Sequence, residues 1–252
     1  MNEDERRSRV AALPSSVPFD LHPPEGDKHA KAKDGATSAL REFFRRVGRK
    51  IYVSKELATY YPGEPVFCPD VLAVRDVEVR AREKWVVSDE GKGLDFVLEV
   101  HVSGDRTKDF ERNVLLYARL GIPEYFAFDR RHMRLAGWRL PDPTARVYVP
   151  IVPQAGRFAS SVLELELALE EDRIRFYFGT AALAEAEELV RRLERSVDEV
   201  GERAQQEAER AQQEAERAQQ EAERADASAK RADDLERQLA AALAEIEKLR
   251  SR

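Results

Sequence analysis

Two acidic residues lie in short β-rich segments of the sequence, where a charge is unusual. Asp70 begins the apolar run DVLAV after Pro69, and Glu99 lies inside the run DFVLEVHV. An ionised carboxylate held away from water costs several kcal/mol unless a partner compensates it. Glu99 is therefore expected to face either solvent or a cation.

If these two segments are neighbouring strands, Asp70 and Glu99 converge at one point, where their charges repel. A hard divalent ion such as Mg²⁺ resolves this conflict, because it prefers one or two carboxylates together with water and phosphate oxygens. His101 follows Glu99 by two residues, so strand periodicity places both on one face. An imidazole there would suit a general base or a group that positions water. The alternative is that Asp70 caps a turn while Glu99 and His101 lie on an exposed face.

The spacing of apolar residues predicts the elements that position these side chains. Residues 95–128 form a strand, a helix and a second strand, which implies a crossover unit with Glu99 near the carboxyl end of its first strand. Residues 34–50 have the spacing of an amphipathic helix. Its polar face, which is most often solvated and sometimes binds phosphate, carries Arg41, Glu42, Arg45 and Arg46. Further β-rich runs occupy residues 50–61, 68–74, 133–140, 146–152, 162–169 and 173–178.

Composition divides the 252 residues into three parts. Residues 1–28 are rich in charges and prolines, with too little apolar surface to offset ordering entropy, and are expected to be a flexible arm. Residues 29–180 form the predicted α/β domain. Residues 181–252 are almost purely helical in pattern.

Bulk properties exclude several classes of protein. No apolar run approaches the ~20 residues needed to span a bilayer, and the N-terminus lacks the apolar core of a signal peptide. The single Cys68 provides neither a disulfide framework nor zinc-site spacing. We therefore expect a cytoplasmic protein without membrane contact. The net charge of −6 argues against a surface coated in positive charge, although a local basic groove is compatible with it.

The runs CPDVLAV and DFVLEVHVSGDRTKDFERNVLLYARLGIPEYFAFD resemble the Uma2 family of restriction-type endonucleases, also catalogued as DUF820, within the PD-(D/E)XK nuclease superfamily. The resemblance covers about residues 29–180. It implies a restriction-endonuclease-like fold, which is a mixed sheet flanked by helices. It also implies hydrolysis of phosphodiesters in nucleic acid, with DNA as the expected substrate and Mg²⁺ or Mn²⁺ as the cofactor. Asp70 and Glu99 match the metal ligands of the family.

Two positions depart from the family pattern. His101 stands where the superfamily has a lysine two residues beyond the second acid, and Asn113 stands where many Uma2 members carry a lysine on the following helix. Asp109 and Tyr117 on that helix match the family. His101 would then handle water activation, with the other three residues supporting the metal ligands. The alternative is a nuclease fold that has lost catalysis and serves as an interaction or scaffold protein.

Seven-residue periodicity dominates the C-terminal segment. The sequence AQQEAER occurs three times from Ala204 to Arg224, and a 4-3 spacing then continues through Leu235, Leu239, Ala242, Ile246 and Leu249. A strict seven-residue repeat predicts a left-handed coiled coil, formed by a homodimer or with a partner chain. The alternative is a single solvated helix held by Glu–Arg pairs, because alanine stripes bury little area. The complete prediction is an α/β nuclease-like domain followed by a long helical coiled coil.

Overall fold

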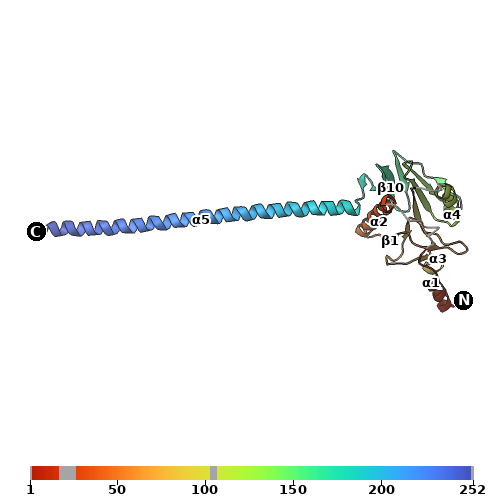
Figure 1. Ribbon diagram of the computed structural model, residues 1–252, viewed down its shortest axis with the longest axis horizontal. Helices are drawn as coiled ribbons and strands as arrows, with labels where there is room; N and C mark the ends of the chain where they lie inside the picture. The colour runs from red at the N-terminus through yellow and green to blue at the C-terminus, as the bar shows by residue number, and fades with distance from the viewer. Residues whose placement is uncertain (1, 17–26, 103–106, 251–252) are drawn as a thin grey trace. The chain divides into compact units, whose positions relative to one another are not determined.

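The structure is a computed structural model that describes residues 2–16, 27–102 and 107–250, with side chains omitted at 28, 29, 187 and 244–250. It divides into two compact units, Met1–Leu189 and Val190–Arg252. The first unit is built on a mixed six-stranded sheet in the order β1-β3-β5-β6-β7-β8 (Figure 1). Its strands are β1 (Ile51–Lys55), β3 (Val71–Arg75), β5 (Phe96–His101), β6 (Glu124–Asp129), β7 (Arg134–Arg139) and β8 (Val149–Pro150).

The crossover predicted for residues 95–128 is confirmed. Strands β5 and β6 are parallel, and all other pairs in this sheet are antiparallel. The connection between β5 and β6 contains a π-helical turn, η2 (Lys108–Arg112), which leads directly into α4 (Asn113–Arg119). Both central strands are buried along their whole length. Glu99 is the fourth of the six residues of β5 and therefore lies toward its carboxyl end.

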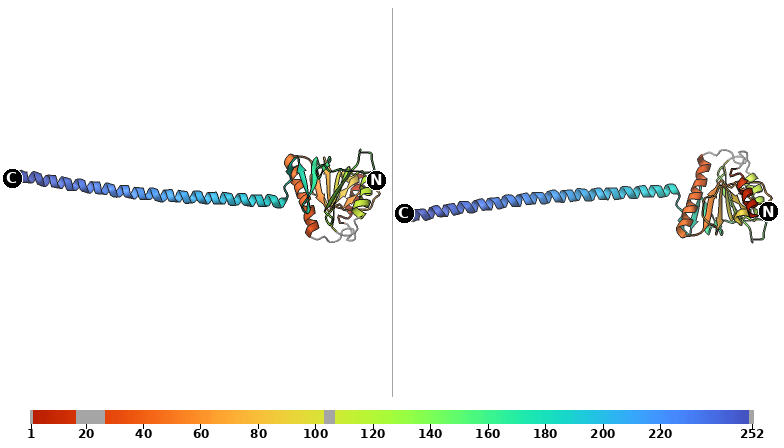
Figure 2. Two further views of the ribbon diagram at one scale, coloured as in Figure 1. Left: turned by 90° about the horizontal axis from the view of Figure 1, so that it is seen from above. Right: turned by 90° about the horizontal axis from the view of Figure 1, so that it is seen from below.

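Two hydrophobic clusters cover the opposite faces of this sheet. On one face, helix α2 (Asp27–Val47) and the second sheet pack through Leu40, Phe44, Leu167 and Phe176. On the other face, α4 packs through Tyr117 and Ala118. Figure 2 shows α2 and α4 on opposite sides of the strands. The second sheet contains β9 (Arg157–Ser160), β10 (Leu165–Glu170), β11 (Arg173–Phe178) and β12 (Ala181–Ala182), and a small pair joins β2 (Thr59–Tyr60) to β4 (Trp85–Val86).

The N-terminal residues correct one prediction. Residues 3–12 were expected to belong to a flexible arm, but they form helix α1 (Glu3–Ala12). Asn2 caps this helix by accepting a hydrogen bond from the Glu5 backbone N–H at 2.8 Å, and the Glu5 carboxylate accepts one from the Asn2 N–H at 3.1 Å. Arg6 also donates a hydrogen bond to the Ser88 carbonyl in α3 (Val87–Glu90). Capping and this tertiary contact outweigh the high charge. Residues 17–26 of the expected arm lie outside the described residues.

The C-terminal unit is helical. Helix α5 (Ala186–Arg250) begins five residues after the predicted start at 181, because Ala181 and Ala182 pair with β11 as a short strand. Every side chain described from Val190 to Leu243 is exposed. Within the described ranges, no helix combines the length and the apolar character needed to cross a membrane.

Candidate active site

Strands β3 and β5 bring Asp70 and Glu99 together. Val71 lies opposite Leu98 in the antiparallel pairing, so the residue before β3 approaches the residue after Leu98. The Asp70 backbone N–H donates to Glu99 Oε2 at 3.3 Å, and the Val100 N–H donates to Asp70 Oδ2 at 2.7 Å. Asp70 and Glu99 are only 7% and 5% exposed. The alternative of an exposed face is therefore wrong.

Tyr117 fixes the orientation of Glu99. Its hydroxyl donates a hydrogen bond to Glu99 Oε1 at 2.6 Å from helix α4. The Tyr117 ring is buried and meets Tyr125 of β6 edge to face, with ring centroids 5.0 Å apart. The parallel crossover places α4 over this end of the sheet, and the hydroxyl of Tyr117 therefore reaches the carboxylate of Glu99. Figure 1 shows α4 beside the central strands.

Burial and charge repulsion act together on Glu99. Burial raises the pKa of Glu99 well above 4.5, and the nearby charges of Asp70 and Asp109 raise it further. The hydrogen bond from Tyr117 and the positive charge of Lys108 oppose this shift. The ionised form of Glu99 is therefore disfavoured in this site, and an added positive charge would favour it.

A second group of hydrogen bonds adjoins the carboxylate pair. His101, the last residue of β5, places Nδ1 at 3.0 Å from Asp109 Oδ2. The Asn113 amide donates to Asp109 Oδ1 at 3.3 Å. If His101 is neutral with its proton on Nδ1, Asp109 accepts that proton's hydrogen bond and Nε2 remains the basic nitrogen. The structure thus brings all six predicted site residues into one region, with His101 paired to Asp109.

The π-helical turn η2 positions Asp109. The Tyr125 hydroxyl donates to the Asp109 backbone carbonyl at 2.7 Å, which ties this turn to β6. Burial raises the pKa of Asp109, while Lys108 and His101 act in the opposite direction. Isolated π-helical turns occur frequently at functional sites, because the extra residue redirects a side chain. A plain helix was predicted for this segment, and its hydrophobic spacing gave no signal of the π turn.

Sequence reasoning missed two lysines at this site. Lys33 of α2 is fully buried, forms an ion pair with Glu56, and places Nζ 3.7 Å from Asp70 Oδ1. Lys108 is exposed at the start of η2 and acts electrostatically on Glu99. A signal for Lys33 existed, because it falls three and seven residues before the buried Ala36 and Leu40, on the same helical stripe. The helix was expected from residue 34, whereas it begins at Asp27.

Comparisons with known proteins identify a family. A family model described as "Uma2: Putative restriction endonuclease" matches residues 19–172, well over half of the chain. The chain belongs to the Uma2 family. A crystal structure titled as a putative nuclease belonging to DUF820, from Anabaena variabilis, is similar to this Uma2 chain with a TM-score of 0.45 and 15% identity, over 58% of this chain and 79% of that one. No curated protein matches the sequence.

The donor set of this Uma2 domain fits a hard divalent ion. One oxygen of each carboxylate is held by a short hydrogen bond, at 2.7 Å for Asp70 and 2.6 Å for Glu99. Carboxylate oxygens carry about four lone-pair sites in all, so these bonds leave acceptor capacity for a metal. In the described part of the chain, no three His, Cys, Asp or Glu side chains form a metal-binding cluster. Mg²⁺ does not need one, because it retains waters and uses one or two carboxylates.

Proposed function

We propose that this Uma2 protein is a divalent-metal-dependent endonuclease that hydrolyses phosphodiester bonds of DNA. The observation that carries the proposal is the buried Asp70–Glu99 pair, in which burial and mutual repulsion raise the pKa of Glu99. Backbone hydrogen bonds keep this pair close, and the nearby Lys33 is shared between Asp70 and Glu56, so the site holds more acidic groups than one lysine can neutralise. Such an arrangement suits Mg²⁺ or Mn²⁺.

Each residue of the proposed active site would have a distinct role. Asp70 and Glu99 would hold the ion, which supplies Lewis-acid stabilisation of charge on phosphate oxygens. Tyr117 orients Glu99 through its hydroxyl. Asp109 holds the imidazole of His101, whose Nε2 would accept a proton from the attacking water. Lys108, exposed at the rim, would contact the phosphate.

One observation supports the alternative of a scaffold protein that does not cut. Both residues at the family's lysine positions, His101 and Asn113, are engaged with Asp109. A side chain held in this way orients its neighbours and makes fewer contacts of its own with substrate. A cleavage assay distinguishes the two functions. A nuclease would cut DNA when the metal is present, whereas a scaffold protein would not cut it under any condition.

Metal binding is the direct test of the proposed site. Titration of the wild-type protein with Mn²⁺ in a calorimeter should release or absorb heat with a stoichiometry near one. Asp70→Ala should abolish this heat, because one carboxylate on a hard ion is a much weaker site than two. Asp34→Ala is a suitable control, since Asp34 is an exposed carboxylate of α2 that pairs with Lys55. Equal heats from wild type and Asp70→Ala would contradict the assignment.

We also propose that α5 forms a coiled coil with a second copy of the chain or with a partner protein. The helix exposes large apolar side chains at heptad-like spacing, with Val190, Leu193, Val197 and Val200 at its start. Leu235 and Leu239, which belong to the predicted 4-3 spacing, are 66% and 62% exposed. The side chains of Ile246 and Leu249 lie outside the described residues. The chain has a single cysteine, Cys68, which is compatible with the proposed cytoplasmic location.

Association through α5 should make helix stability depend on concentration. The segment 181–252 should be strongly helical, and its melting temperature should rise with protein concentration, as mass action requires of an oligomer. Leu239→Glu should remove this dependence, because it places like charges in the apolar seam. Glu209→Gln, on the polar part of the repeat, is the matched control. A broad melt that is independent of concentration, with only monomer in sedimentation, would show that α5 is a solvated single helix.

A further inference from the structure

A groove lined by arginines runs along the open edge of the main sheet. Strand β1 stands at the end of the sheet order, and among the described residues no strand pairs with its second edge. The groove has a volume of about 580 Å³ between α2, β1 and the loop at residues 79–82. Its lining consists of Arg41, Phe44, Arg45, Arg49, Ile51, Tyr52, Val53, Ser54, Val79, Arg80, Ala81 and Arg82.

All the charged side chains of this lining are positive. It contains five arginines and no acidic residue, although the whole chain has a net charge of −6. The carboxylates that pair with these arginines, Glu42, Glu78, Glu90 and Glu164, are not part of the lining. Arg45 is 71% exposed and donates to Glu42 from two of its five N–H groups, which leaves the others for a ligand. Arg82 is different, because its side chain is 3% exposed and donates to Glu90 and to two backbone carbonyls, so it supports the wall of the groove. The groove therefore presents guanidinium groups above an apolar floor.

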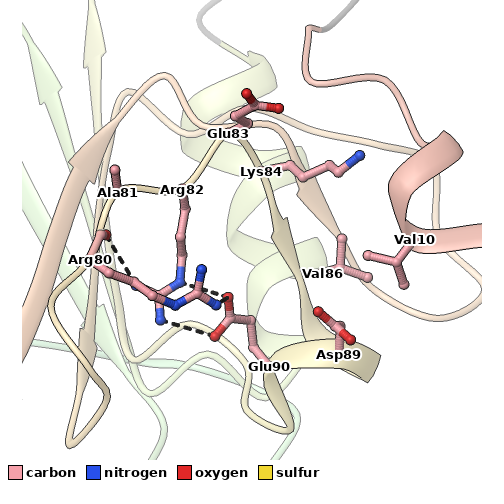
Figure 3. Close-up of a pocket in the computed structure, with 9 residues that line it drawn as sticks. All are labelled: Val10, Arg80, Ala81, Arg82, Glu83, Lys84, Val86, Asp89 and Glu90. Carbon is pink, nitrogen blue, oxygen red and sulfur yellow. Dashed lines mark hydrogen bonds and ion pairs between the residues drawn. The ribbon is translucent and has the colours of Figure 1, made fainter. Parts of the chain in front are cut away.

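The fold holds these arginines in place. Arg41 donates from Nε to the Val53 carbonyl at 2.8 Å, on the open edge of β1. Arg82 stacks on the rings of Tyr52 and Trp85, with its guanidinium carbon 4.5 and 4.9 Å from their centroids. Figure 3, a close-up of a neighbouring pocket that shares Arg80 and Arg82 with the groove, shows both arginines directed toward Glu90, with which they form ion pairs. Fixed guanidinium groups lose little entropy when they bind phosphate.

The groove leads toward the carboxylate pair. Its floor follows β1 as far as Ser54, and the next residue, Lys55, is the register partner of Val71. Asp70 directly precedes Val71. A ligand lying along the edge of β1 would therefore extend toward the end of the sheet where Asp70 and Glu99 lie.

We propose that this arginine groove binds the sugar-phosphate backbone of the nucleic acid on which the carboxylate site acts. The proposal rests on the proposed nuclease function and specifies where the substrate lies. Arg41 and Arg45 are one helical turn apart, ~6 Å along α2, and one DNA strand carries a phosphate every ~3.4 Å of helix axis. The pair therefore spans about two phosphates. The apolar floor then faces sugar and base atoms.

Binding without cleavage tests the groove. Fluorescence anisotropy of a labelled DNA duplex, in EDTA, should show that Arg41→Ala/Arg45→Ala binds at least about 10-fold more weakly than the full-length wild type near 0.1 M salt. The slope of log affinity against log salt should fall by about 2, since each phosphate contact contributes ~1. Arg41→Lys/Arg45→Lys keeps both charges and should preserve most of that slope. Circular dichroism establishes that each variant is folded.

The control is Arg46→Ala. Arg46 neighbours Arg45 and binds the same Glu42 carboxylate, but it does not line the groove. An equal loss in Arg46→Ala, unchanged affinity in the double variant, or binding of poly-glutamate in place of DNA would overturn the proposal. Its failure is distinguishable from failure of the nuclease function. A protein that cleaves DNA with no dependence on Arg41 and Arg45 refutes only the groove, whereas arginine-dependent binding without any cleavage supports the groove and refutes the nuclease.

Discussion

Glu99→Gln is expected to reduce the rate of Mn²⁺-dependent nicking of plasmid DNA by more than about 100-fold. This loss exceeds the loss of activity that is typical when a residue that only orients a metal ligand is removed. The amide carries no charge for the ion. It also has one acceptor oxygen, where the carboxylate accepts from both the Tyr117 hydroxyl and the Asp70 N–H. Initial rates of supercoiled-plasmid loss, with and without Mn²⁺, measure the effect.

Glu124→Gln is the matched control for this loss. Glu124 is also a buried carboxylate that accepts several hydrogen bonds, but it does so from Ser161 and other residues at the opposite end of β6. His101→Ala tests the proton-transfer role separately and should slow cleavage by ~10²-fold while leaving Mn²⁺ binding intact. Undiminished cleavage by Glu99→Gln would remove this carboxylate from the chemistry.

The pH dependence of stability gives an independent readout of Glu99. Its pKa is raised above 4.5 in the folded protein, so the native state retains this proton to a higher pH than the unfolded chain does. Without metal, wild-type stability should therefore fall as pH rises from about 4.5 through the raised pKa of Glu99. Glu99→Gln lacks the titrating group and should lose this part of the pH dependence in urea unfolding. The same slope in both proteins would show that Glu99 is not the titrating group.

The sequence contained enough information for the strands and the carboxylate pair. The runs around Asp70 and Glu99 are short, apolar and bounded by turn residues, so local pattern alone marks them as strands. Their adjacency was a condition of the prediction that spacing alone could not establish, and the antiparallel pairing of β3 with β5 fulfils it. These inferences depend on spacing over a few residues, which is where sequence patterns are strongest.

What the sequence did not show depends on contacts between distant residues. Lys33 lies 37 positions before Asp70, and no local spacing connects them. The arginine groove likewise combines α2 with the loop at residues 79–82. The phosphate-binding face considered for Arg41 and Arg45 could not be separated from a solvated face, because the second wall was unknown. The helix α1 was missed for a related reason, since part of its stabilisation comes from Ser88.

Lys33→Met is expected to destabilise the metal-free protein by about 3 kcal/mol at neutral pH, the cost typical of removing one partner from a buried ion pair. Lys33 is fully buried between Glu56 and Asp70, and its Nζ lies 3.7 Å from Asp70 Oδ1. Methionine replaces most of its volume, so the loss reports charge and not a cavity. Urea unfolding at neutral pH measures it.

Two conditions should restore stability to Lys33→Met if its role is electrostatic. Mg²⁺ should stabilise this variant more than wild type, because the ion supplies the positive charge that the carboxylates have lost. Lowering the pH should also narrow the difference, since the raised pKa of Glu99 favours its neutral form as the pH falls, and neutral Glu99 repels Asp70 less. Lys31→Met, an exposed lysine two residues earlier on α2, should change stability by less than about 0.5 kcal/mol. If neither Mg²⁺ nor acid reduces the loss of stability in Lys33→Met, Lys33 contributes through packing. The carboxylate pair would then be held together by Tyr117 and backbone hydrogen bonds without a resident cation.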